Sequence, residues 1–258
     1  MVLQSAAGAI AGAAAVAVAT PAAAQQARFP AFSRAHDLTH TLTPEFPTFG
    51  GAPGLSIRNV KTFKPDGYNL TEWRVAEHSG THIDAPIHFS ASGPGPADLA
   101  IERLVVPLAV IDVSAKAEAD RDYRLSPDDV TAWEKANGAL PVNACVAMHS
   151  GWDRHVATQR FAGRDDKGTL HFPGFHPETA AMLLKDRNIA GIAVDTLSLD
   201  FGASKDFKTH YAWLGGGRWG LECVANLASL PARGATLVVG APKLKGATGG
   251  PTRVMALF

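Results

Sequence analysis

Three histidines and one aspartate are crowded into residues 78–89, which read His-Ser-Gly-Thr-His-Ile-Asp-Ala-Pro-Ile-His-Phe. Imidazole and carboxylate groups bind borderline divalent metals, and this mixture suits zinc, manganese or iron better than calcium. The segment therefore predicts a metal site in a metal-dependent hydrolase, with the candidate ligands His78, His82, Asp84 and His88. The alternative is a histidine-rich surface loop that binds no metal.

The chain must bend within this segment if the four side chains are to share one site. In a straight strand they would face the same side, but a rise of about 3.3 Å per residue would spread them over roughly 33 Å. A single helix is excluded as well, because Pro86 would lie inside it and break its hydrogen bonding. Gly80 and Pro86 allow a bend, so the sequence predicts a turn between the candidate ligands.

Length and composition predict one α/β domain with a well-buried core. The chain has 258 residues, of which 46% are hydrophobic, and its 24 basic and 24 acidic side chains give a net charge of zero. Because no strong positive field results, we expect no nucleic-acid partner. The only two cysteines, Cys145 and Cys223, exclude a zinc ribbon and a disulfide framework, and whether they pair with each other stays open.

The first 24 residues resemble a targeting segment. Residues 5–20 are almost entirely small and apolar, and residues 21–24 (Pro-Ala-Ala-Ala) offer a small-residue cleavage site. We therefore expect a signal peptide at 1–24, a mature domain at 25–258 and export to a periplasm, with no membrane contact in the mature form. Residues 1–4 lack a lysine or arginine, which a start codon assigned too far downstream would explain. The alternative is a disordered alanine-rich extension of a cytoplasmic protein.

Alternating polarity and breaker residues predict a mixed sheet with few helices. A hairpin is expected around residues 65–67 (Pro-Asp-Gly). Ser126 predicts the start of a helix and Gly138 its end, and Pro107 places part of its strand at an edge or bulge. The expected strands are 36–42, 57–63, 69–77, 104–113, 144–149, 189–196, 235–240 and 252–257, and the expected helices are 127–137 and 177–187.

A second pair of candidate ligands lies far along the chain. His210 and Glu222 flank the glycine run 215–217, which would let the chain turn and bring the two groups together. Taken alone this pair is a weak signal, because a histidine and a glutamate twelve residues apart are common.

The first segment resembles the signature of the cyclase family of metal-dependent hydrolases, which includes bacterial kynurenine formamidase and isatin hydrolase. The matching string is His78-x-Gly80-Thr81-His82-x-Asp84-x-Pro86-x-His88-Phe89. A later histidine followed twelve residues on by glutamate is the second family signature, and His210 and Glu222 fit it. Residues 194–200 and 234–239 are also similar to the family, so the resemblance covers nearly all of 29–257.

The resemblance implies a single-domain α/β fold of the swivelling β/β/α type, usually a homodimer. It implies one or two divalent ions per subunit, Zn²⁺ or Mn²⁺, bound directly by His78, His82, Asp84, His210 and Glu222. With two ions, Asp84 and Glu222 would bridge them, because a carboxylate has two oxygens to share. His88 would act as general base and acid beside the ion, and the alternative is a structural core histidine.

The reaction that the resemblance implies is hydrolysis of an amide by a metal-activated water. The candidate substrates are aromatic: the formamide N-formylkynurenine, which belongs to tryptophan catabolism, and the cyclic amide isatin. Export and the long segment 152–175 favour the isatin-like substrate. Two other functions stay open: a non-catalytic periplasmic metal-binding protein, and a family member with lyase or ring-forming chemistry. Five side chains are candidates for an aromatic pocket: Phe46, Phe49, Trp73, Trp213 and Trp219.

Overall fold

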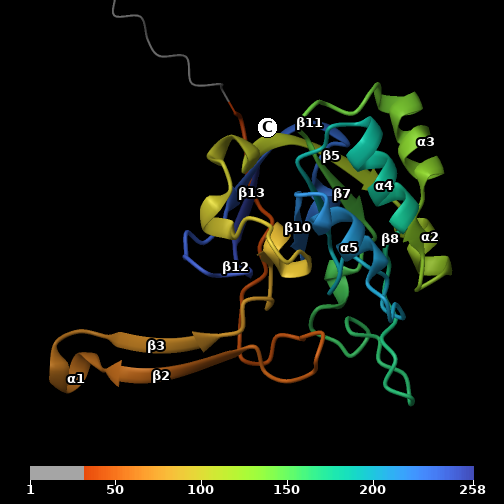
Figure 1. The fold of residues 1–258 in the computed structure, drawn as a ribbon. Coiled ribbons are helices and arrows are strands. Elements are labelled where there is room, and N and C mark those ends of the chain that lie inside the picture. The colour runs from red at the N-terminus through yellow and green to blue at the C-terminus, as the bar shows by residue number, and fades with distance from the viewer. Residues whose placement is uncertain (1–31) are drawn as a thin grey trace, which may run out of the picture. The chain divides into compact units, whose positions relative to one another are not determined.

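A nine-stranded mixed sheet forms the centre of the fold in the computed structural model, which describes residues 32–258 (Figure 1). The four middle strands run parallel: β5 (Val105–Asp112), β7 (Cys145–His149), β9 (Gly191–Val194) and β10 (Trp219–Glu222). Every residue of the last three strands is buried, as expected for parallel strands covered on both faces. The predicted leader, residues 1–24, lies outside the described residues and stays a prediction.

Antiparallel strands extend the sheet on both sides. The spatial order is β1-β13-β11-β5-β7-β9-β10-β4-β12. Ile83, from one flank, and Leu237, from the other, belong to the same buried cluster, so the sheet curls around this core. The flanking strands are β1 (Ala35–Asp37), β13 (Arg253–Leu257), β11 (Arg233–Gly240), β4 (His82–Asp84) and β12 (Gly249–Pro251).

Helices cover the other face of the sheet. Alternate residues of β5 enter the two cores, because Leu108 packs inside the curl whereas Ala109 and Ile111 pack with the helices. The two predicted helices are confirmed, and Ser126 caps the first of them by accepting a hydrogen bond from Asp129 N. The helices are α2 (Ser114–Ala119), α3 (Pro127–Asn137), α4 (Pro177–Asp186) and α5 (Lys208–Gly215).

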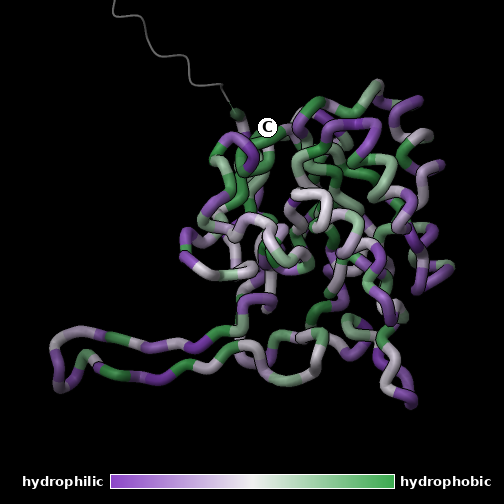
Figure 2. Tube along the Cα trace, in the orientation of Figure 1, coloured by the Kyte–Doolittle hydropathy of each residue, from purple (hydrophilic) through white to green (hydrophobic). Residues whose placement is uncertain are grey.

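A two-stranded ribbon, which we call the arm, projects from the body of the domain (Figure 1). It consists of β2 (Leu55–Lys61), the short helix α1 (Phe63–Asp66) and β3 (Leu70–Val75), which confirms the predicted hairpin. Ile57 and Trp73 are paired across the ribbon, and these two residues are 54% and 66% exposed. Apolar and polar residues alternate along the arm in Figure 2, so it presents apolar groups at its surface.

Most remaining strand predictions are confirmed with shorter bounds. The early strand expected at 36–42 ends after Asp37, and the chain then makes only an isolated bridge at Thr39. Pairing of β5 with β7 begins at Leu108. The preceding residue, Pro107, therefore pairs only with β11, as predicted for an edge position. The sequence does not predict α5 or the strands β4, β10 and β12, because segments this short carry weak local signals, and α5, β10 and β12 also contain glycine.

Cys145 and Cys223 are both free and buried, so the two do not form a disulfide. A second short ladder pairs β6 (Arg124–Leu125) with β8 (Gly174–Phe175) in parallel. Within residues 32–258, no helix is long and apolar enough to cross a bilayer.

Candidate metal centre

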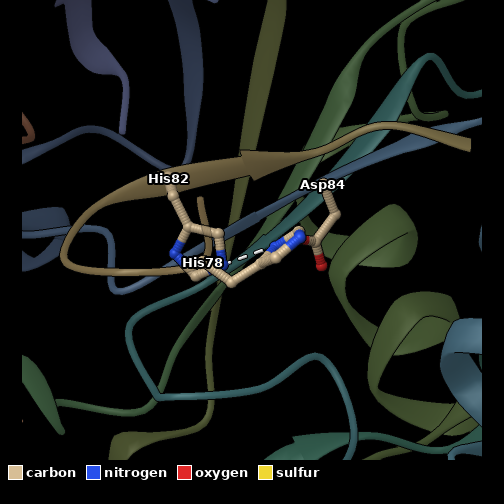
Figure 3. A group of neighbouring side chains, drawn as sticks. All are labelled: His78, His82 and Asp84. Atoms are coloured by element: carbon tan, nitrogen blue, oxygen red, sulfur yellow. Dashed lines mark hydrogen bonds and ion pairs between the residues drawn. The ribbon is translucent and has the colours of Figure 1, made fainter. Parts of the chain in front are cut away.

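Three predicted ligands of the first segment, His78, His82 and Asp84, come together at a bend of the chain (Figure 3). Gly80 has a φ of 65°, a left-handed conformation that favours glycine, and the bend turns His78 back toward β4. His78 Nδ1 lies 2.7 Å from Asp84 Oδ1, and His82 Nε2 lies 3.3 Å from the same oxygen. The predicted turn between the ligands is therefore confirmed.

His210 and Glu222 reach the same place from α5 and β10. Glu222 is directly opposite His82 in the antiparallel pair of β10 and β4, and its Oε2 lies 3.3 Å from His82 Nε2. His210 Nε2 lies 3.2 Å from Glu222 Oε1 and 3.4 Å from Asp84 Oδ2. All five predicted ligands are thus gathered in one site, the metal cluster: His78, His82, Asp84, His210 and Glu222.

The buried atoms of the metal cluster fit a divalent cation. Within the described residues, His82 Nε2 and Asp84 Oδ2 are buried without a hydrogen-bond partner. Two ionised carboxylates removed from water need positive charge nearby. Protons on the histidines supply that charge in the metal-free protein: burial alone would lower the pKa of His82, but the carboxylates of Asp84 and Glu222 raise it to about 10. A divalent cation among the same atoms would supply the charge instead.

Hydrogen bonds to the outer nitrogens of two histidines point their Nε2 atoms at the carboxylates. His82 Nδ1 donates to Gly80 O over 2.8 Å, and His210 Nδ1 donates to Asp200 Oδ2 over 2.6 Å. Asp200 also accepts from the backbone N–H groups of Thr209 and His210, which fixes the first turn of α5. Such partners orient an imidazole for metal binding. Sequence reasoning gives Asp200 no role, because its position ten residues before His210 carries no signal.

His88 lies beside the metal cluster on the 3₁₀ turn η1 (Pro86–Phe89). Its ring stacks on that of His78, with centroids 3.8 Å apart and planes 22° from parallel. One of its nitrogens is within 4.8 Å of ligand atoms of Asp84 and His210. Burial lowers the pKa of His88, which favours the neutral imidazole that a general base requires. The position also suits a metal ligand, so the role of base stays a prediction.

A cavity of ≈ 260 Å³ opens beside the metal cluster and His88. Its apolar wall includes Phe49, Phe89, Leu197 and Phe207, and none of its described lining residues is a lysine or an arginine. The rings of Phe89 and Phe207 pack with centroids 5.7 Å apart. Sequence reasoning misses three of these four residues, although Phe89 stands inside the recognised motif, next to His88.

Four of the five aromatic residues predicted for the pocket lie elsewhere. Trp213 and Trp219 are buried in the two cores of the sheet, Phe46 belongs to a third buried cluster, and Trp73 lies on the arm. Only Phe49 lines the cavity. The packing around Trp219 depends on a glycine. A Cβ at Gly191 would lie 2.3 Å from the ring of Trp219, so only glycine leaves room for the ring at this position.

The loop after β7 is tied to the end of β9 by Asp195, a buried carboxylate outside the metal cluster. Asp195 accepts from the backbone N–H groups of Ser150 and Trp152, both over 3.0 Å, and from Ser150 Oγ over 2.5 Å. Leu197, two residues later, lines the cavity, so these bonds anchor part of its wall. His149, which ends β7 where active-site loops often begin, does not line the cavity.

Replacing Asp195 with asparagine is expected to remove a pH-dependent part of the stability. Burial raises the pKa of Asp195 from its ordinary value of 3.8 to about 6. Between these pH values the folded protein keeps a proton that the unfolded chain has lost. The free energy of unfolding therefore falls as the pH rises, by about 3 kcal/mol in total. Urea unfolding of the metal-free proteins between about pH 4 and about pH 7 should show the wild type losing this amount relative to Asp195→Asn, and a constant difference would contradict it.

Both the sequence and the fold match known proteins. The family model described as putative cyclase matches residues 36–201. Isatin hydrolase of Roseibium aggregatum is 33% identical over 228 residues, which are 84% of this chain and 85% of that protein. Kynurenine formamidase of Salinibacter ruber is 26% identical over 187 residues, 72% of this chain and 79% of that protein. The solved structure of isatin hydrolase A from Labrenzia aggregata bound to benzyl benzoate is similar with a TM-score of 0.82 and 33% identity, over 87% of this chain and 93% of the other. The chain therefore belongs to the cyclase family of metal-dependent hydrolases.

Proposed function

We propose that the protein hydrolyses a small, uncharged aromatic amide of the cyclic type, such as isatin, with a divalent ion held by the metal cluster. The observation that carries the proposal is the cavity of ≈ 260 Å³, in which the metal cluster and His88 face an aromatic wall. Hydrolysis adds the hydroxyl group of one water to the acyl carbon and the remaining proton of that water to the nitrogen as the C–N bond breaks. A cyclic amide thereby opens to a single product that carries both the acid and the amine.

The metal cluster would hold one or two ions, Zn²⁺ or Mn²⁺, through three imidazoles and two carboxylates. When bound, such an ion lowers the pKa of a coordinated water from ~15.7 towards ~7 and polarises the substrate carbonyl. Asp84 lies within 3.4 Å of three histidines and Glu222 within 3.4 Å of two, so both carboxylates are placed beside the imidazoles that would share the ion or ions. His88 would take a proton from the attacking water and return it to the leaving nitrogen.

The cavity favours isatin over N-formylkynurenine. Its volume of ≈ 260 Å³ is below the usual range of about 300–1,000 Å³ for small-molecule pockets, which favours a compact substrate. N-formylkynurenine carries a charged amino-acid group, and a buried carboxylate needs a partner such as arginine or lysine. The described lining offers neither. Isatin hydrolase of Roseibium aggregatum is also 33% identical over 84% of this chain, whereas kynurenine formamidase of Salinibacter ruber is 26% identical over 72% of it.

A comparison of rates tests this choice. The zinc- or manganese-loaded protein should hydrolyse isatin with a kcat/KM at least about tenfold above that for N-formylkynurenine, a difference of about 1.4 kcal/mol in transition-state binding. One equivalent of acid released per isatin consumed distinguishes hydrolysis from lyase or ring-forming chemistry. Faster turnover of N-formylkynurenine would overturn the substrate proposal and leave the metal-dependent hydrolysis in place.

We further propose that the protein is a homodimer in which the arm packs on a second copy. An isolated two-stranded ribbon is at best marginally stable in water, so it needs a surface to cover it. Ile57 and Trp73 share one face of the arm, and no described residue of the same chain buries them. Large exposed apolar groups gathered in this way mark interaction sites. The expected partner is a second subunit, as the family resemblance implies.

Replacing Trp73 with glutamate is expected to dissociate the dimer. The substitution puts a charge on the apolar face of the arm, where burial in an interface would remove it from water. Sedimentation velocity should report the wild type as a dimer and Trp73→Glu as a monomer. Ser56→Glu is the matched control, because Ser56 lies on the opposite face of the ribbon, across from Arg74, and its variant should stay dimeric. A wild type that sediments as a monomer would refute the proposal.

A further inference from the structure

The three histidines of the metal cluster are not oriented alike. His82 and His210 direct Nδ1 outward to a hydrogen-bond acceptor and keep Nε2 toward the carboxylates. His78 is reversed: its Nε2 lies 3.0 Å from Thr248 Oγ1, and its Nδ1 lies 2.7 Å from Asp84 Oδ1. Figure 3 shows the His78 ring directed at Asp84; His82 and Asp84 lie on β4, whereas His78 precedes this strand.

The contacts of Thr248 decide which nitrogen of His78 carries the proton. Thr248 Oγ1 lies 2.5 Å from Glu77 Oε2, and the backbone N–H of Thr248 also donates to both oxygens of Glu77 over 3.2 Å. A carboxylate only accepts hydrogen bonds, so the hydroxyl proton of Thr248 is donated to Glu77. The remaining lone pairs of the hydroxyl can only accept, and the His78 nitrogen that faces them must donate. Nε2 therefore carries a proton, and Nδ1, which lies against the carboxylate of Asp84, is the nitrogen that a cation would bind in place of any proton there.

The backbone around Thr248 fixes this arrangement. Thr248 O accepts a hydrogen bond from Ala85 N over 3.0 Å, and the next residue, Gly249, pairs with Asp84 as β12 lies along β4. A Cβ at position 249 would lie 2.4 Å from Ile83 O and 2.6 Å from His78 Cε1, so the imidazole rests against bare backbone. The glycine-rich residues 245–250 therefore pack against the metal cluster. They are not a phosphate-binding loop, because they lack its Gly-Lys-Ser/Thr ending.

We propose that Glu77 and Thr248 are positioning residues that fix the tautomer of His78, so that Nδ1 is its metal-binding atom. The proposal rests on the proposed function only in taking the metal cluster to bind a divalent cation. Partners of this kind, which hold the outer nitrogen of a metal-binding histidine, raise metal affinity by about 10–100-fold. Neither residue is part of the recognised motif, and neither needs to touch the substrate.

Zinc affinity of a set of variants tests the proposal, measured by competition with a chelating dye on the full chain. Thr248→Val keeps the shape of the side chain and removes the hydroxyl, and it should weaken Zn²⁺ binding about 10–100-fold. Thr248→Ser restores the hydroxyl and should bind close to the wild type. Thr252→Val is the matched control in the same segment. Among residues 32–258 the Thr252 hydroxyl bonds to Gly250 O and to no group of the metal cluster, so the zinc affinity of this variant should not change.

If Thr248→Val folds poorly, the variant Glu77→Gln and NMR spectra of the wild type still test the proposal. Glu77→Gln can place its amide N–H toward Thr248, which would let the hydroxyl donate to His78 and favour a proton on Nδ1; it should also weaken Zn²⁺ binding. In ¹⁵N-histidine spectra of the zinc-loaded wild type, His78 should show a protonated Nε2 and a metal-bound Nδ1, with its signals assigned by their absence in His78→Asn.

Two results would overturn the positioning role: wild-type zinc affinity in both Thr248→Val and Glu77→Gln, or a zinc-loaded wild type whose His78 proton is on Nδ1. Each of these requires that the wild type binds zinc, so each leaves the proposed function intact. A correctly folded wild type that binds neither zinc nor manganese would overturn the proposed function, and the positioning role with it.

Discussion

Replacing His82 with alanine is expected to abolish both metal binding and hydrolysis. His82 Nε2 is central to the metal cluster, 3.3 Å from Asp84 Oδ1 and 3.3 Å from Glu222 Oε2. Loss of a partner that merely orients a ligand costs about 10–100-fold in affinity, so loss of the ligand itself should cost more. Metal content by mass spectrometry and kcat for isatin should therefore fall together in His82→Ala, with activity reduced by at least about 1,000-fold because the ion that activates water is absent.

A matched histidine outside the site controls for nonspecific effects of the substitution. His171 is only partly buried, but like His82 it lies between two carboxylates, with Nδ1 2.7 Å from Asp122 and Nε2 3.4 Å from Asp165. His171→Ala should keep the metal content and kcat of the wild type, whatever it does to stability. A folded His82→Ala protein that still holds a full complement of metal would show that the ion is bound elsewhere.

Replacing His88 with glutamine is expected to separate catalysis from metal binding. The His88 ring stacks on His78 beside the cavity, and burial lowers its pKa, so a neutral imidazole faces the place where water would attack. A general base contributes about 10²–10⁴-fold to the rate, and glutamine cannot replace it in that role. We expect kcat for isatin to fall by that factor while zinc or manganese content stays at the wild-type level. If metal content falls in proportion to activity, His88 is a ligand rather than the base.

The candidate metal-binding segment was predictable because its signal is local. His78, His82 and Asp84 lie within seven residues, and Gly80 provides the bend that joins them. His210 and Glu222 were different: only the family resemblance raised them above an ordinary pair of polar residues. Their approach to the first segment depends on β10 pairing with β4 and on α5 packing over the sheet, and neither arrangement is visible in local sequence.

The substrate pocket was the least predictable part, because residue type does not reveal which way a side chain faces. Trp213 and Trp219 have the chemistry of a pocket wall, yet both are buried where they add most to the cores. Phe207, the residue immediately before α5, lines the cavity, and the sequence does not predict this helix. The position of Thr248 was equally unpredictable, because it depends on the three-residue strand β12, whose Gly-Gly-Pro sequence has little strand propensity.

The most direct test of the central claim is isatin hydrolysis by the purified full chain before and after metal exchange. The protein is stripped with a chelator, divided, and reloaded with zinc, manganese or neither. We predict no hydrolysis by the stripped protein, recovery on reloading, and one equivalent of acid for each isatin consumed. Undiminished hydrolysis by the stripped protein would contradict the metal-dependent mechanism. Firm stoichiometric metal binding without hydrolysis of isatin or N-formylkynurenine would contradict the catalytic claim and favour a non-catalytic metal-binding protein.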